Sequence, residues 1–302
     1  MQKVIIITGP TGVGKTKLSI QLAKELNGEI ISADSCQVYK GFDIGSAKIS
    51  KADMQNVKHY LIDINNPTEE YSAGDFAKHA SKAIKEIASK GKLPIIVGGT
   101  GLYINSLLYP LSTDAKRDEK YREELENIVV NQGKEKLFSM LKEVDPESSE
   151  VLNINQVDRI IRALEIYKST GKKKSELVKT SKSEYDYLLL VLNRERSEVY
   201  DLINKRVDQM INSGLIDEVK NLLESGVPEN APAMKAIGYK EVLSYIKDEI
   251  SLIDCVNLIK QKSRNYAKRQ LTYFKKMQNA EFVDYNDSEK INNMIVKFLK
   301  EK

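Results

Sequence analysis

The feature that most constrains this chain is the segment GPTGVGKT at residues 9–16, which follows the pattern G-x-x-x-x-G-K-T. An apolar run at residues 4–7 precedes it, and apolar residues at helical spacing follow it up to residue 23. This order predicts a glycine-rich loop between a strand and a helix, with backbone amides and a helix N-terminus facing a phosphate. The alternative is a glycine-rich turn that binds nothing.

The residues of this loop have separate expected roles. Glycines let the backbone approach a ligand closely, and Lys15 adds a point charge for terminal phosphates. The hydroxyl of Thr16 is a candidate ligand for Mg²⁺. The candidate phosphate site comprises Gly9, Pro10, Thr11, Gly12, Val13, Gly14, Lys15 and Thr16. The pattern predicts a diphosphate or triphosphate with a metal, and it does not identify the compound.

Composition excludes several classes of protein. Two cysteines and two histidines among 302 residues are too few for a disulfide framework or a zinc site. No stretch approaches the roughly 18 consecutive apolar residues of a membrane span. We therefore expect a soluble, cytoplasmic protein without a membrane partner. The net charge of +4 permits a polyanionic partner but does not require one.

Short apolar runs alternate with helical patterns in the first third of the chain. Strands are expected at 4–8, 29–32 and 93–97, and helices at 17–26, at 73–90 and from 102. This alternation predicts an α/β fold with a P-loop NTPase-like parallel sheet covered by helices. Ligands of such folds bind at the carboxyl ends of the strands, where we expect polar turns at 9–16, 34–37 and 98–101.

The composition of the sequence changes at residue 114, where a mostly charged segment begins. Helical patterns continue from there to about residue 170. The apolar run at 187–192 then predicts a return to the sheet. We therefore expect an α/β core of residues 1–113 and 187–302 and a helical insertion of residues 114–186. From residue 197 onward the pattern is helical, with breaks at Gly214, at residues 226–232 and at Gly238.

Two polar turns carry candidate catalytic groups. Asp34 ends the second expected strand, where a carboxylate can accept a proton from an attacking O–H or N–H group. A turn or helix-capping role is the alternative for Asp34. Gln37 has the paired donor and acceptor that suit an adenine edge. Thr100, surrounded by three glycines, is a candidate for contact with a phosphate or a base, and a capping role is its alternative.

Two helical segments carry basic residues that suit an anion. Arg159 and Arg162 lie three apart on an otherwise apolar helix, which indicates either an anion clamp or ordinary surface charge. Residues 260–276 hold seven basic residues, no acidic one and interleaved aromatic residues, with Lys260, Arg264 and Lys268 on one face. Such a helix is typical of a nucleic-acid surface, and a solvated helix is the alternative.

Several segments, taken in order, resemble the tRNA dimethylallyltransferase family in its bacterial type. They extend from residue 4 to about residue 277 and are GPTGVGKT, DSCQVYKGFDIGSAK, HYLIDI, VGGTGLY, RIIRALEIY, RVDQMINSGLIDEV, AIGYKE and YAKRQLTYFKK. Many families share the first segment, whereas DSCQVYKGFDIGSAK and VGGTGLY are far more specific. Cys36 stands where Met is common in the family, which we interpret as a packing substitution.

The resemblance implies a substrate pair and a reaction. The loop would hold the pyrophosphate of dimethylallyl diphosphate with Mg²⁺, and the dimethylallyl group would move to N6 of adenosine 37 in tRNAs that read codons starting with U. Adenine would be flipped into one end of a channel, and the donor would enter from the other. Asp34 would accept a hydrogen bond or proton from N6. The departing pyrophosphate would be stabilised by Lys15, by Thr16 through Mg²⁺, by Thr100 and by Arg122.

The resemblance also implies which residues contact the tRNA. They are Asp34, Ser35, Cys36 and Gln37, then Asp158, Arg159, Ile160, Ile161 and Arg162, and finally Lys260, Arg264 and Lys268 on the basic helix. The insertion would grip the anticodon stem-loop, and we expect a monomer. An adenylate isopentenyltransferase, acting on free AMP, ADP or ATP, is the nearest alternative. A small-molecule kinase and a non-catalytic RNA-binding NTPase are more distant alternatives, and a kinase explains neither the insertion nor the basic helix.

Overall fold

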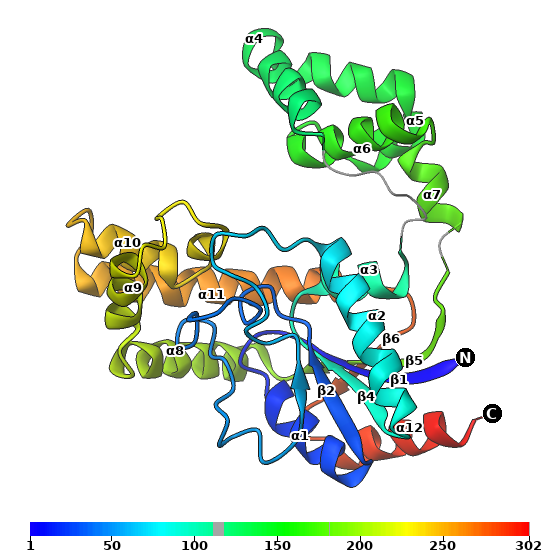
Figure 1. Cartoon of the computed structure of the whole chain (residues 1–302), viewed down its shortest axis with the longest axis vertical. Coiled ribbons are helices and arrows are strands. Elements are labelled where there is room, and N and C mark those ends of the chain that lie inside the picture. The colour runs from blue at the N-terminus through cyan, green and yellow to red at the C-terminus, as the bar shows by residue number, and fades with distance from the viewer. Residues whose placement is uncertain (111–117, 181, 302) are drawn as a thin grey trace. The chain divides into compact units, whose positions relative to one another are not determined.

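The computed structural model describes residues 1–110, 118–180 and 182–301 of the chain (Figure 1). Within these residues there is one six-stranded sheet of parallel strands in the order β3-β2-β4-β1-β5-β6. The strands are β1 (Gln2–Thr8), β2 (Gly28–Ser32), β3 (His59–Tyr60), β4 (Leu93–Val97), β5 (Tyr185–Asn193) and β6 (Ala280–Asp284). The predicted α/β fold with a parallel sheet is confirmed.

The central strands read as continuous apolar runs because helices cover the sheet. β1 lies between β4 and β5, and Ile5 is opposite Ile95 on one side and Leu188 on the other. Helices α1 (Lys15–Glu25) and α12 (Ser288–Lys300) share one apolar cluster with the sheet. Helix α2 (Ala73–Ser89) packs against β2 and β4, and α3 (Gly101–Leu108) packs against α2. None of the described helices combines the length and the apolar character needed to cross a membrane.

Two edge strands, β3 and β6, were not expected from the sequence. The C-terminal part is helical as predicted except at β6, which runs parallel to β5 at the edge of the sheet. Only Val283 of its five residues is buried. An edge strand needs no continuous apolar run, so the sequence carries little sign of it. β3 comprises only two residues and follows β2 at the opposite edge.

A group of helices follows β5 and packs beside the carboxyl ends of the strands (Figure 1). It consists of α8 (Arg196–Asn212), α9 (Leu215–Glu224), the 3₁₀ helix η1 (Pro232–Lys235), α10 (Tyr239–Ile246) and α11 (Leu252–Phe274). Its apolar cluster includes Val38, Tyr39 and Phe42, which come from the segment after β2. The polar turn that follows β2 is therefore held between the sheet and these helices.

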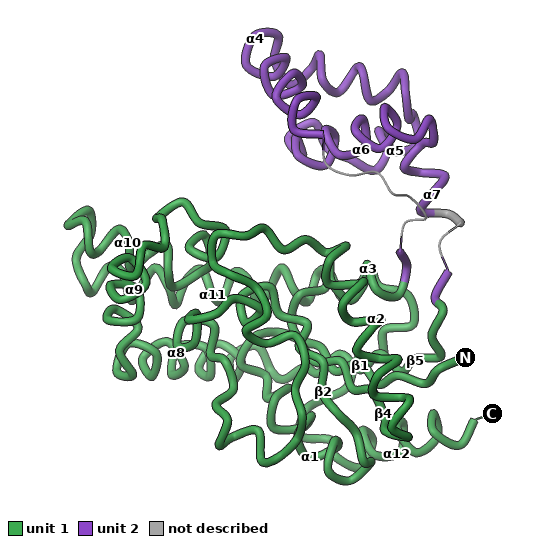
Figure 2. The backbone as a smooth tube through the Cα atoms, viewed as in Figure 1, with its two compact units in different colours: residues 1–108, 184–302 green, residues 109–183 purple. Residues whose placement is uncertain are grey.

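The chain divides into two compact units, unit 1 with residues 1–108 and 184–302 and unit 2 with residues 109–183 (Figure 2). Unit 2 contains α4 (Glu119–Val144), α5 (Pro146–Val151), α6 (Val157–Thr170) and α7 (Lys174–Thr180) around its own apolar cluster. The expected boundary between residues 113 and 114 lies outside the described residues. The other expected boundary, between 186 and 187, falls inside β5, which begins at Tyr185.

Candidate active site

The loop at residues 9–16 connects β1 to α1, and two of its glycines are sterically required. Gly9 has a φ of 137°, and a Cβ there would lie 2.3 Å from the carbonyl oxygen of Leu192. Gly14 has a φ of 110°, and a Cβ there would lie 2.4 Å from the ring of Tyr285. In the described residues no side chain caps the N-terminus of α1. The helix end and the loop therefore present backbone amides to an anion.

Lys15 is the cation of this loop. Its Nζ donates to the carbonyl oxygens of Gly9 at 3.0 Å and Pro10 at 2.9 Å. The pKa of Lys15 is lowered to about 7, chiefly by burial and secondly by the nearby Arg206, while Asp34 opposes the shift. A bound anion would stabilise the charged form and raise this pKa again.

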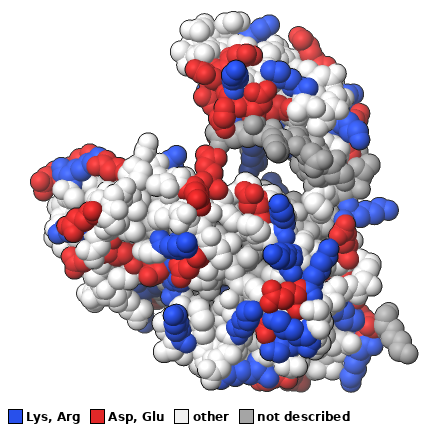
Figure 3. All heavy atoms as spheres, in the orientation of Figure 1, with Lys and Arg blue, Asp and Glu red and all other residues white. Residues whose placement is uncertain are grey.

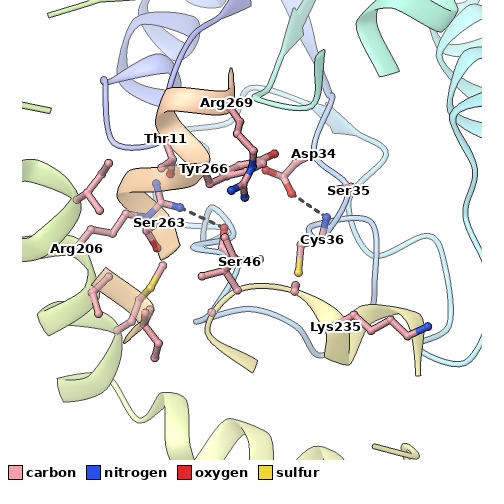
Figure 4. Close-up of a pocket in the computed structure, with 17 residues that line it drawn as sticks. Thr11, Asp34, Ser35, Cys36, Ser46, Arg206, Lys235, Ser263, Tyr266 and Arg269 are labelled. Atoms are coloured by element: carbon pink, nitrogen blue, oxygen red, sulfur yellow. Dashed lines mark hydrogen bonds between the residues drawn. The ribbon is translucent and has the colours of Figure 1, made fainter. Parts of the chain in front are cut away.

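Two adjoining cavities meet beside the loop. The first, here called the P-loop cavity, has a volume of about 380 Å³ and is lined by the loop from Thr11 to Thr16, by the ends of β2 and β4, and by Gln37 and Gln270. The second, here called the α8–α11 cavity, measures about 310 Å³ and lies between those two helices and the segment from Asp34 to Ser46 (Figure 4). The residues that line both cavities are Thr11, Asp34, Arg206 and Tyr266.

Asp34 uses its two carboxylate oxygens differently. Oδ1 accepts hydrogen bonds from the backbone amides of Cys36 at 2.8 Å and Gln37 at 3.2 Å. The hydrogen bonds of the Asp34 side chain among the described residues all go to Oδ1. The turn role that was the alternative for Asp34 is therefore present, and it orients the carboxylate while Oδ2 is left for a ligand in either cavity. Ser35 and Cys36 line the α8–α11 cavity beside it.

Arg206 was not among the expected site residues, although it opens the segment RVDQMINSGLIDEV. It lies on α8, lines both cavities, and donates from Nη2 to the carbonyl oxygen of Ser46 at 3.3 Å (Figure 4). Burial lowers the pKa of its guanidinium, and Asp34 opposes that shift. A second, half-buried cation thus stands near Lys15, at the position where negative charge would be held.

Helix α11 contributes a wall of the site as well as a basic surface. Gln270 is 5% exposed and joins two loops, because its Oε1 accepts from the Thr11 amide at 2.9 Å and its Nε2 donates to the Gly99 carbonyl oxygen at 2.9 Å. Tyr266 and Arg269 point toward Asp34 in the α8–α11 cavity (Figure 4). The sequence pattern showed the basic residues of this helix but did not show which of its faces closes the site.

Thr100 and Gln37 use their side-chain polar groups to hold the turn together, although Gln37 also lines the P-loop cavity. Thr100 Oγ1 accepts from the Ser35 amide at 3.1 Å, and Thr100 is not among the lining residues of either cavity. In the side chain of Gln37, Oε1 accepts from Ser32 Oγ at 3.1 Å, and Nε2 donates to the carbonyl oxygens of Ser46 and Ala47. The roles we expected for these two side chains on substrate stay predictions.

Unit 2 contains Arg122 and the segment from Asp158 to Arg162. Arg122 forms two hydrogen bonds with Glu165, at 3.2 Å from Nε and 3.1 Å from Nη2, and the Glu165 side chain is fully buried. Ile160 and Ile161 are 0% exposed in the core of this unit, so we correct their expected contact with tRNA to a packing role. Asp158 and Arg159 are exposed, and Arg162 is half-buried.

The basic face of α11 is partly engaged inside unit 1. Lys260 pairs with Asp208 at 2.6 Å, and Arg264 donates to Asn204 Oδ1 at 2.6 Å, both on α8. Lys268 is exposed. On the face shown in Figure 3, Lys and Arg side chains are interspersed with Asp and Glu, in keeping with the net charge of +4.

The site fits Mg²⁺ only together with a phosphate ligand. In the parts of the chain that the structure describes, no group of three or more His, Cys, Asp or Glu side chains could hold a metal ion. Thr16, at the start of α1, lines the P-loop cavity together with Asp34. Mg²⁺ commonly takes one or two protein oxygens and completes its shell with water and substrate phosphate oxygens, so this donor set is sufficient only when a diphosphate is present.

Comparison with known proteins gives one family. The sequence model described as IPP transferase matches residues 37–277. A tRNA dimethylallyltransferase from Bacillus cereus (strain AH187) is 47% identical over 297 residues, which are 97% of this chain and 93% of that protein. A tRNA dimethylallyltransferase from Bacillus anthracis is also 47% identical, over 97% of this chain and 94% of its own length.

Solved structures agree with this result. A tRNA isopentenylpyrophosphate transferase from Bacillus halodurans is 43% identical and has a TM-score of 0.75, covering 99% of this chain and 97% of its own. A eukaryotic dimethylallyltransferase, solved acting on tRNA, is 31% identical and has a TM-score of 0.85 over 98% of this chain and 80% of its own. With the family model matching most of its residues and relatives far above 30% identity, this chain belongs to the IPP transferase family.

Proposed function

We propose that this chain transfers the dimethylallyl group of dimethylallyl diphosphate to N6 of adenosine 37, in tRNAs that read codons starting with U, and releases pyrophosphate. The relatives named as tRNA dimethylallyltransferases support the reaction class. The structural observation that carries the proposal is the junction between the two cavities. Asp34 and Arg206 line both of them, so a base and a cation stand where two substrates would meet.

Each cavity suits one substrate. The P-loop cavity offers backbone amides, Lys15 and Arg206 to a diphosphate. The α8–α11 cavity has apolar walls from Ile203, Val207 and Ile259, and it carries the Asp34 carboxylate, which suits a flat base with an exocyclic amine. Flipping adenine out of an anticodon loop costs little because that loop is largely unpaired. Holding both substrates in line supplies a large part of the rate acceleration.

The transfer step follows from this arrangement. N6 of the adenine attacks C1 of the dimethylallyl group, the C1–N6 bond forms as the bond from C1 to the pyrophosphate oxygen breaks, and the N6 proton passes to Asp34. Lys15 and Arg206 stabilise the charge that develops on the pyrophosphate. Mg²⁺, held by Thr16 with the diphosphate, would neutralise part of the same charge when bound.

The proposal also covers the contacts with tRNA, the oligomeric state and the location in the cell. Unit 2 would hold the anticodon stem-loop, with exposed Arg159 as a phosphate contact and Arg122 turned toward the substrate only if its pairing with Glu165 is exchanged. Lys268, exposed on α11, would contribute a further phosphate contact. We also propose that the enzyme acts as a monomer in the cytoplasm.

The deciding experiment is a labelling assay. The protein is incubated with Mg²⁺, radiolabelled dimethylallyl diphosphate and an unmodified tRNA carrying A36 and A37, with AMP and ATP in parallel reactions. We expect label in the tRNA and none when A37 is changed to G. Label in AMP or ATP alone would assign the chain to the free-nucleotide transferases, and phosphate transfer from ATP without label transfer would assign it to the kinases.

A further inference from the structure

Three of the segments that carry the family resemblance meet at one hydrogen-bonded cluster beside the α8–α11 cavity. Glu218 on α9 belongs to RVDQMINSGLIDEV, Tyr239 on α10 belongs to AIGYKE, and the loop from Phe42 to Ser46 belongs to DSCQVYKGFDIGSAK. None of the chemistry described above uses Glu218 or Tyr239. Their arrangement therefore needs an explanation of its own.

The Glu218 carboxylate holds the 42–46 loop through consecutive backbone amides. Oε2 accepts from the amides of Asp43 at 3.1 Å and Ile44 at 2.6 Å, and Oε1 accepts from the amide of Gly45 at 3.2 Å. Tyr239 donates its hydroxyl to the same Oε1 at 2.7 Å. A carboxylate that accepts three backbone amides fixes the position of a loop far more tightly than a surface contact does.

Packing removes the remaining freedom of this loop. Tyr239 and Phe42 are both 0% exposed, and their rings lie 4.6 Å apart. A Cβ on Gly45 would lie 2.5 Å from the Tyr239 ring, so the loop backbone is in direct contact with the ring that orients Glu218. The next residue, Ser46, therefore has a defined position in the wall of the α8–α11 cavity.

The carbonyl oxygen of Ser46 is where this loop reaches the site. It accepts from Arg206 Nη2 at 3.3 Å (Figure 4). It also accepts from Gln37 Nε2 at 3.4 Å. Among the described residues, Ser46 is the hydrogen-bond acceptor for the Arg206 guanidinium, and Arg206 lines both cavities together with Asp34. A displacement of Ser46 by about 1 Å would lengthen this contact beyond hydrogen-bonding distance.

We propose that Glu218 is a positioning residue for Arg206. It does not contact the substrates; it sets the location of the Ser46 carbonyl oxygen and, through it, of the guanidinium at the junction of the two cavities. This role rests on the proposed function only in so far as Arg206 acts in the transfer. Misplacing a group by about 1 Å in such a site costs on the order of 100-fold in rate.

The test uses Glu218→Gln, which keeps the shape but replaces an acceptor oxygen with a donor that opposes backbone amides. Its matched control is Glu224→Gln, the same change at an exposed position of α9. We expect Glu218→Gln to lower kcat by roughly 10- to 100-fold with little change in the KM for tRNA, and Glu224→Gln to match the wild type. Tyr239→Phe, a smaller change at the same oxygen, should lower kcat in the same direction.

A double-mutant cycle with Arg206→Lys separates positioning from general damage to the fold. If Glu218 acts through Arg206, Glu218→Gln should cost less than about twofold in the Arg206→Lys background. Equal fold losses in both backgrounds, or full activity of Glu218→Gln, would overturn the proposal. Should Glu218→Gln fail to fold, Tyr239→Phe takes its place in the cycle with the same outcomes.

Crystal structures of the variants give an answer that does not depend on the reaction. We expect the contact between Ser46 and Arg206 to be broken in Glu218→Gln and kept in Glu224→Gln. An Arg206 that stays on Ser46 in Glu218→Gln would refute the positioning role. If the wild-type protein transfers no dimethylallyl group, the proposed function fails, and these structures still decide whether Glu218 holds Arg206.

Discussion

The lowered pKa of Lys15 predicts how many protons the protein takes up when dimethylallyl diphosphate binds. Its pKa in the free protein is about 7, lowered first by burial and then by Arg206. A diphosphate in the P-loop cavity stabilises the ammonium, so the pKa rises on binding and the complex takes up a proton. At pH 8 a group with this pKa is about one-tenth charged, and donor binding should therefore take up about 0.9 proton; near pH 6 the uptake should be only about 0.1.

The sign of the pH dependence follows from the same linkage. Because the bound state favours the protonated lysine, the affinity for dimethylallyl diphosphate with Mg²⁺ should fall as the pH rises above about 7, by at most about tenfold per pH unit. Isothermal titration calorimetry in buffers of different ionisation enthalpy measures the proton uptake directly. Diphosphate oxygens also titrate near neutral pH, so the quantity of interest is the difference between wild type and Lys15→Arg, whose guanidinium stays charged.

Two results would refute this reasoning. Equal proton uptake by wild type and Lys15→Arg at pH 8 would mean that Lys15 is already charged in the free protein. A ratio of wild-type affinity to Lys15→Arg affinity that does not fall as the pH rises above 7 would mean that the diphosphate does not lie against Lys15. The substitution Arg206→Gln adds an internal check, because removing the second cause of the shift should raise the pKa of Lys15 and reduce the uptake at pH 8.

Further predictions concern the base, the loop and the basic helix. Asp34→Asn should keep tRNA binding, measured by filter binding, and lose on the order of 100-fold or more in turnover, and equal turnover would exclude Asp34 as the proton acceptor. Gly9→Ala should lower the free energy of unfolding by on the order of 3 kcal/mol in urea titrations, since its Cβ would lie 2.3 Å from the Leu192 carbonyl oxygen; unchanged stability would contradict that geometry. Replacing Lys260 and Arg264 with Ala should lower the melting temperature slightly and leave the salt slope of tRNA binding nearly unchanged, because both side chains pair with α8. A clearly flatter salt slope would show instead that these two residues contact RNA.

Local patterns were enough to predict most of the sheet. The apolar runs before residues 9, 33 and 98 and the run at 187–192 are all strands, because a buried parallel strand needs nonpolar residues on both faces. β6 was missed for the same reason, since an edge strand with a single buried residue lacks that signature. Asp34 and the loop from Gly9 to Thr16 were found because their spacing from a strand end is a property of contiguous sequence.

Arg206 and Gln270 could not be assigned to the site from their own surroundings. Each sits on a long helix among other polar residues, and its role depends on how α8 and α11 pack against the strand ends. The same packing explains the basic helix. The sequence shows that the basic residues Lys260, Arg264 and Lys268 are spaced four apart on one face of the helix. It does not show whether that face contacts water, RNA or another helix.

The sequence by itself thus determined the class of fold, the phosphate loop, the carboxylate next to it and, through ordered motifs, the family. These are properties of short segments, in which neighbouring residues decide the backbone conformation and the burial of a strand. Tertiary structure alone decided that Asp34 and Arg206 line both cavities and that the Glu218 carboxylate accepts backbone amides of the 42–46 loop. Those contacts join residues far apart in the chain, and their energies depend on distances that exist only once the helices pack onto the sheet.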